Sequence, residues 1–133
     1  MPEFESQYAG PYIHPSAMVR AYLEAAEFTD CGPDAEAELR EADGFSPEAI
    51  AEAAQYCAEF QAANAASLAA AYAAMPSYDE QRAGHDLWLT RNHHGAGFWD
   101  RGLGEVGERL TKAAHGLGER SLYAGDDCYL YFG

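Results

Sequence analysis

The sequence predicts an α+β fold, a helical N-terminal half packed on a small, partly antiparallel sheet of about three strands. Apolar residues recur every three or four positions over residues 47–75, which is the spacing of one helix face. Side-chain character alternates over residues 85–92, 121–124 and 128–132, which is typical of strands. A chain of 133 residues with 48% hydrophobic residues fits one domain, residues 1–133, with a substantial core.

The pairs Gly10-Pro11 and His14-Pro15 predict an extended arm over residues 1–15. This arm lacks the basic start and apolar centre of a secretory signal peptide. Ser16 is placed to cap a helix over residues 17–28. An acidic connector follows over residues 29–45, where Gly32-Pro33 interrupts the helix. Its like charges oppose helix formation, so we expect a loop or a frayed helical turn.

A long helix is predicted from Pro47 to about Met75, ending before Pro76. Ser46 caps its start, and proline suits the first helical position. Asn64 interrupts the apolar stripe, either as a buried, hydrogen-bonded amide or where the stripe rotates. We favour rotation, because an unpaired buried amide costs about 1–3 kcal/mol.

The second half of the chain predicts the sheet. Residues 85–92 are expected to form a strand, with Trp88 covered on its second face. Asp100 is expected to cap a helix over residues 101–115. The last two strands would form a hairpin around the turn Gly125-Asp126-Asp127.

Charge is the strongest global signal. The chain has 22 acidic and 8 basic residues and a formal net charge of −14. Residues 1–80 hold 15 acidic residues and two arginines, whereas residues 81–133 hold seven acidic and six basic residues. Such a chain repels phosphate, which disfavours direct nucleic-acid binding, and is attracted to basic surfaces. The alternative is an acidic surface that serves only solubility.

Cysteine usage and hydropathy bear on location. The three cysteines are far apart and form no metal-binding pair, which indicates a reducing compartment. The most apolar run, residues 62–75, is mostly alanine and is too short to span a bilayer. We therefore expect no membrane association.

The segment AGHDLWLTRNHHGAGFWDRGLGEVGERL resembles one found in small acidic proteins of bacteriophages and prophages. In that family the position of His93 is usually glycine, and an acidic hairpin like Tyr123–Tyr129 follows. The resemblance implies a phage origin and a role in the host cytoplasm. Small acidic phage proteins include inhibitors of host defence, among them anti-CRISPR proteins and DNA mimics, which is an analogy of class rather than of motif.

This segment also carries a polar set with chemical potential. A histidine beside a carboxylate can act as a general base or hold a metal. However, the adjacent histidines would point in opposite directions in an extended segment, and the spacing of a helical zinc site is missing. We favour a structural role, in which Asp86 or Asp100 pairs with Arg91 or Arg101, and we assign no catalytic residue, metal or cofactor. The candidate residues of this alternative functional loop are His85, Asp86, Arg91, His93, His94, Trp99 and Asp100.

The acidic half offers the best binding candidates. Its carboxylates could present charge to a basic groove, although a solvated face is an equally simple interpretation. The candidate partner-binding residues are Glu24, Glu27, Asp30, Asp34, Glu36, Glu38, Glu41, Asp43, Glu48, Glu52 and Glu59. The first hypothesis is a non-enzymatic phage protein that inhibits a host nucleic-acid-binding defence machine by occupying its basic surface. The alternatives are a small metal-dependent or His/Asp hydrolase and a phage structural or assembly accessory protein.

Overall fold

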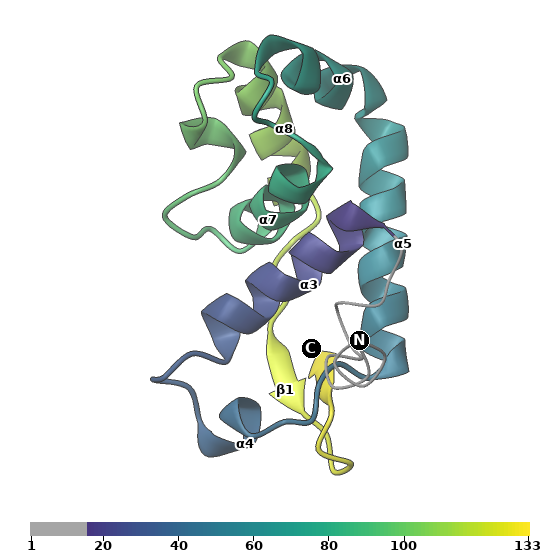
Figure 1. The fold of residues 1–133 in the computed structure, drawn as a ribbon, viewed down its shortest axis with the longest axis vertical. Coiled ribbons are helices and arrows are strands. Elements are labelled where there is room, and N and C mark those ends of the chain that lie inside the picture. The colour runs from purple at the N-terminus through teal and green to yellow at the C-terminus, as the bar shows by residue number, and fades with distance from the viewer. Residues whose placement is uncertain (1–15) are drawn as a thin grey trace.

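A computed structural model describes residues 16–133. The fold is α+β, as the sequence predicts, with a small antiparallel hairpin at one end of a helical body (Figure 1). The sheet has two strands within the described residues rather than about three. The predicted extended arm, residues 1–15, lies outside this range.

The first described helix, α3 (Ala17–Asp30), confirms the predicted helix and extends it by two residues. Ser16 caps it, because its side chain accepts a hydrogen bond from the Val19 N–H at 3.3 Å. The acidic connector then contains one short helix, α4 (Ala37–Arg40). After it, the chain runs beside the hairpin, where Leu130 N–H donates to Gly44 O at 2.8 Å.

The long predicted helix is two helices, α5 (Pro47–Ala63) and α6 (Ala65–Ala74). Ser46 caps α5 as predicted, accepting from Ala49 N–H at 3.0 Å. The break is at Asn64, whose side-chain amide and backbone N–H both donate to Phe60 O. Asn64 therefore ends α5 instead of continuing its stripe, and α6 leaves the axis of α5 at the top of Figure 1.

The predicted strand over residues 85–92 is wrong, because these residues belong to helix α7 (Glu80–Arg91). Asp79 starts this helix by accepting a hydrogen bond from Arg82 N–H at 3.0 Å. The helix is buried on most sides, and its buried residues include Asp86, Thr90 and Arg91. Because these polar residues occupy the buried face of α7, the sequence lacks the three- to four-residue apolar spacing of a helix. The remaining apolar residues alternate as in a strand, which led to the wrong prediction.

Gly84 is the point where α7 crosses α3. A Cβ atom at Gly84 would lie 2.2 Å from Met18 O and 3.0 Å from the Ala21 Cβ. Such distances are far below van der Waals contact, so only glycine lets the two backbones approach this closely. This crossing places the indole of Trp88 inside the protein, where its N–H donates to the Thr29 hydroxyl at 2.9 Å.

The predicted helix over residues 101–115 starts later than expected. Asp100 does not cap it but ends a short 3-10 helix, η1 (Phe98–Asp100). Helix α8 (Glu105–His115) begins after Gly104, whose φ of 63° suits glycine. Trp99, a candidate of the alternative functional loop, is 50% exposed, whereas Phe98 is buried against Phe60 with ring centroids 5.7 Å apart.

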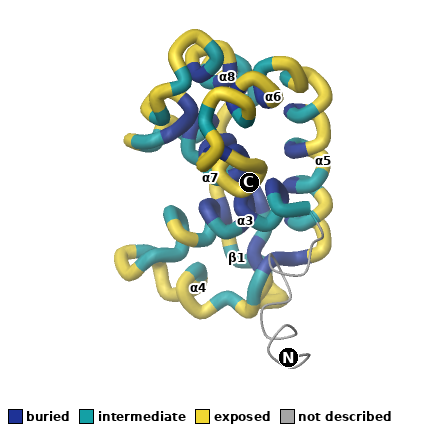
Figure 2. The backbone as a smooth tube through the Cα atoms, turned by 45° about the horizontal axis from the view of Figure 1, so that its top comes forward, coloured by how far each residue is buried: buried dark blue, intermediate teal, exposed yellow. Residues whose placement is uncertain are grey.

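The hairpin confirms the sequence prediction. Strands β1 (Leu122–Ala124) and β2 (Leu130–Phe132) are antiparallel, with Tyr123 opposite Tyr131. Leu122, Leu130 and Phe132 face the core, and Phe132 packs against Trp88 at 5.6 Å. Figure 2 shows the buried backbone gathered where α3, α5 and α7 meet, with exposed segments at both ends.

Candidate functional site

The eleven predicted acidic candidates fall into an exposed and a half-buried group. Glu24, Glu27, Asp30 and Glu52 are half-buried. The exposed candidates are Asp34, Glu36, Glu38, Glu41, Asp43, Glu48 and Glu59.

Three of the half-buried carboxylates have internal partners. The Glu24 Oε1 lies 2.9 Å from the His85 Nε2. Asp30 accepts a hydrogen bond from Leu122 N–H at 3.0 Å, which ties α3 to β1. Glu52 receives two hydrogen bonds from Arg120, each 2.8 Å long. These side chains hold the fold together, so the surface available to a partner is narrower than the sequence suggested.

The hairpin adds carboxylates that the sequence interpretation did not join to the connector. Asp126 and Asp127 are exposed at its turn. The turn is fixed to the connector because Asp43 N–H donates to Cys128 O at 2.8 Å. The acidic hairpin was visible in the sequence, but its pairing with residues 43–46 depends on contacts more than eighty residues apart.

The connector, the start of α5 and the hairpin lie at the same end of the molecule (Figure 1). We call this surface the acidic pole, and it consists of Asp34, Glu36, Glu38, Glu41, Asp43, Glu48, Asp126 and Asp127, all exposed. Arg40 is the one basic residue in the connector and hairpin segments, residues 29–48 and 121–133. Its Nε donates to Ala35 O at 2.9 Å. Helix α8, which carries Arg109 and Lys112, lies at the opposite end.

The alternative functional loop contains one compact polar cluster. Asp86 is fully buried and pairs with Arg101, whose Nη2 lies 2.8 Å from its Oδ1. The Tyr78 hydroxyl donates to the other oxygen at 2.7 Å. Burial and this hydrogen bond raise the pKa of Tyr78 far above its usual value, so the phenol stays protonated. The predicted ion pair is thus confirmed as Asp86 with Arg101.

Arg91 lies elsewhere and has a different role. It is fully buried, and its guanidinium donates to Gly118 O at 2.8 Å, Leu117 O at 3.1 Å and the Tyr22 hydroxyl at 3.0 Å. The guanidinium carbon also lies 4.2 Å from the centroid of the Tyr56 ring. The two carbonyls follow the end of α8, where the helix dipole is negative. Arg91 therefore anchors this end of α8 to α3 and α7.

The remaining loop candidates are dispersed. His93 is exposed and stacks on His115 with ring centroids 4.3 Å apart. His94 continues the turn that ends α7, since its N–H donates to Leu89 O at 2.9 Å. Asp100 is exposed on η1, its Oδ1 3.9 Å from the Arg101 guanidinium. The structure thus brings together Asp86 and Arg101 but places His93 and His94 at the far end of α7.

Metal ligation and thiol chemistry receive little support. Residues 16–133 contain no group of three or more histidine, cysteine, aspartate or glutamate residues placed to hold a metal ion. Burial raises the pKa of Cys57 to about 12 and, with Glu27 and Asp30 nearby, that of Cys31 to about 11. Both thiols are therefore poor nucleophiles at neutral pH.

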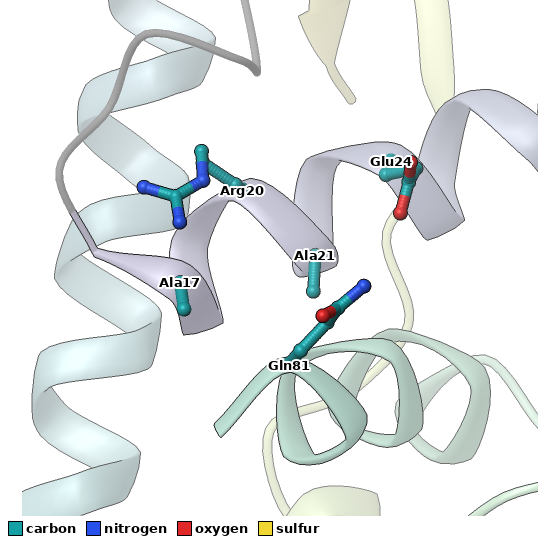
Figure 3. A pocket seen from close by; sticks show the side chains of 5 residues that line it. All are labelled: Ala17, Arg20, Ala21, Glu24 and Gln81. Carbon is teal, nitrogen blue, oxygen red and sulfur yellow. The ribbon is translucent and has the colours of Figure 1, made fainter. Parts of the chain in front are cut away.

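Two depressions lie along α7. The first, about 190 Å³, lies between α3 and α7, where Gln81 extends toward α3 (Figure 3). Of the described residues, Glu24 supplies the one carboxylate that lines this depression, and it is hydrogen-bonded to His85. The second, about 480 Å³, lies over the Asp86–Arg101 pair. Ser77 and His85 also line the second depression, where the Nε2 of His85 is engaged by Glu24.

Comparisons with protein-family models, curated proteins and solved structures found no match to this chain. Within residues 16–133, no helix is both long and apolar enough to cross a membrane.

Proposed function

We propose that this chain is a non-enzymatic binding protein whose acidic pole occupies the basic surface of a host nucleic-acid-binding protein. One observation carries the proposal. The connector together with the first turn of α5, and the distant hairpin turn, place eight exposed carboxylates at one end of the molecule with a single arginine among them. A surface of this sign competes for sites that otherwise hold phosphates.

The resemblance of the Gly84–Gly104 segment to phage proteins supplies the biological context. In this proposal the protein acts in the cytoplasm of an infected host, and its partner is a defence protein that binds nucleic acid, such as a CRISPR effector. The chain would then inhibit the partner by covering its nucleic-acid site. Because the resemblance carries no functional motif, the partner's chemistry rests on charge alone.

The decisive experiment uses the immobilised full chain to capture a partner from nuclease-treated host lysate. The partner should elute with a short DNA duplex and with moderate salt, since both compete for charge. A variant carrying Glu36→Lys, Glu38→Lys, Glu41→Lys and Asp43→Lys, which we call the connector variant, should lose the partner. These side chains are exposed, so the variant should fold.

The matched control carries the same charge change elsewhere. Glu80→Lys, Glu105→Lys, Glu108→Lys and Glu119→Lys also replace exposed carboxylates, but outside the acidic pole. This control variant should retain the partner. If both variants lose the partner equally, the interaction depends on the net charge of the chain and not on the acidic pole. Capture that resists both DNA and salt would contradict binding through the acidic pole.

The two alternatives have their own tests. A hydrolase that uses the alternative functional loop would hydrolyse a generic ester or phosphodiester panel and lose that activity after His93→Ala and His94→Ala. A structural or assembly protein would be found in purified virions. A positive result in either test would replace the binding proposal.

A further inference from the structure

The outer face of the hairpin carries a second built feature, a stacked pair of tyrosines. Tyr123 and Tyr131 are directly opposite in the register of β1 and β2. Their ring centroids are 5.6 Å apart and their planes differ by 20°. Because the inner face of the sheet is buried, these rings lie on its solvent side, and Tyr123 is 50% exposed.

Two glycines make room for the rings. A Cβ atom at Gly125 would lie 2.6 Å from the Tyr131 Cε1, and one at Gly133 would lie 3.0 Å from the Tyr123 Cδ1. Side chains at these positions would therefore displace the rings. The pair is held in place before any partner arrives, which lowers the ordering cost of binding.

Carboxylates frame the rings. The Tyr131 hydroxyl donates to the Asp127 Oδ2 at 2.6 Å, and the Asp127 Oδ1 accepts from Tyr129 N–H at 3.1 Å. These hydrogen bonds lower the pKa of Asp127 and raise that of Tyr131 to about 12, so a carboxylate and a neutral phenol face each other at neutral pH. Each Asp127 oxygen keeps a second lone pair for an external donor.

The rings and carboxylates line an open depression of about 440 Å³, which we call the tyrosine pocket. Its lining residues are Tyr123, Ala124, Gly125, Asp126, Asp127 and Tyr131. Ring faces attract cations, and flanking carboxylates strengthen that preference. A planar guanidinium can stack on a ring while donating to a carboxylate, which a lysine ammonium does less well.

We infer that the tyrosine pocket binds an arginine side chain of the protein partner that the acidic pole engages. The inference rests on the proposed function, because it names the group by which the same basic partner would be recognised. The acidic pole supplies long-range attraction, and the tyrosine pocket supplies selectivity for arginine over other cations.

The experiment titrates the full chain with three acetylated peptide amides: Gly-Arg-Gly-Arg-Gly and its lysine and citrulline counterparts. Ring signals of Tyr123 and Tyr131 are followed by NMR. The arginine peptide should bind about threefold or more tightly than the lysine peptide. The citrulline peptide, which is neutral and nearly isosteric, should cause no saturable shift.

Variants separate the tyrosine pocket from charge. Tyr123→Ala should lower the affinity for the arginine peptide about fivefold, which is the upper range for one exposed cation–π contact. Tyr123→Phe, which keeps the ring and preserves the hairpin, should bind as the parent does. Phe28→Ala is the matched control, because Phe28 is an aromatic residue 82% exposed among acids but outside the tyrosine pocket.

The outcomes distinguish this inference from the proposed function. Equal affinity for arginine and lysine peptides, or unchanged affinity in Tyr123→Ala, overturns the arginine pocket even if the connector variant loses its partner. Loss of arginine selectivity in Tyr123→Ala supports the tyrosine pocket even if the connector variant still captures protein, a result that would count against the acidic pole. If Tyr123→Ala unfolds the hairpin, the test passes to Asp126→Asn. This variant must then lower the affinity for the arginine peptide at least twofold for the inference to stand.

Discussion

His93 occupies a backbone position that favours glycine. Its φ is 58°, in the left-handed region, one residue beyond the cap of α7. His93 N–H donates to Thr90 O and His94 N–H donates to Leu89 O, the two hydrogen bonds of a Schellman motif.

His93→Gly should therefore raise the free energy of unfolding by up to about 1 kcal/mol, the cost of a left-handed non-glycine residue. Urea denaturation measures the change. His93→Ala is the control, because it keeps the strained backbone while removing the ring that stacks on His115. A His93→Gly protein less stable than His93→Ala would show that the backbone carries no strain at this residue.

The buried Asp86 makes a second prediction at the residue scale. Arg101→Met leaves this carboxylate inside the protein with only the Tyr78 hydroxyl as partner. Breaking a buried pair in this way should cost about 3 kcal/mol. Arg109→Met is the control, because its 3.8 Å contact with Glu105 is exposed and should contribute less than about 0.5 kcal/mol.

Thermal and urea unfolding of both variants check this difference. The double variant Asp86→Asn/Arg101→Met should recover part of the loss, since it removes the unpaired charge. If Arg101→Met and Arg109→Met cost the same, Asp86 is not held by Arg101 in solution.

At the scale of elements, the crossing of α3 and α7 depends on one missing side chain. Gly84→Ala would place a methyl group 2.2 Å from Met18 O, so the helices must separate. The free energy of unfolding should fall by about 3 kcal/mol or more, which is the upper end of the range for overpacked sites. Gly95→Ala is the matched control, because a Cβ there meets nothing within 4 Å. Circular dichroism with urea checks both, and a cost below about 1 kcal/mol for Gly84→Ala would refute the close crossing.

Elements with local signals were predictable from the sequence. Ser16 and Ser46 mark helix starts because a cap acts within three residues, and the hairpin follows from a short turn between alternating strands. Helix α7 was not predictable by periodicity, because the partners of Asp86 and Arg91 lie on other elements. Asp79 was the available signal, because it is a capping residue directly before Glu80, where α7 begins.

The candidate surfaces show the same division. The exposed connector carboxylates follow from composition, since a run of like charges remains solvated. These carboxylates lie near Asp126 and Asp127 only because Phe45 pairs with Leu130, which is far away in the sequence. The tyrosine pocket likewise needs the register of the hairpin, which sets Tyr123 beside Tyr131.

At the scale of the whole molecule, the segments that carry the acidic pole lie at one end and α8 lies at the other (Figure 1). The acidic pole holds eight exposed carboxylates, and the net charge of the chain is −14. Repulsion within the acidic pole opposes folding, because folding brings the connector and hairpin acids together. Added salt shortens the Debye length from about 30 Å at 0.01 M to about 8 Å at 0.15 M, which screens this repulsion.

The melting temperature should consequently rise by about 3–5 °C between 10 and 200 mM NaCl, equivalent to roughly 1 kcal/mol for a domain of this size. The connector variant should show a smaller rise, because four lysines replace four repelling carboxylates, whereas the control variant with lysines elsewhere should keep more of it. Differential scanning calorimetry measures all three. A melting temperature that falls with salt would mean that ion pairs such as Glu52–Arg120 outweigh the repulsion, since screening weakens attraction equally. The acidic pole would then not be the dominant electrostatic feature of the fold.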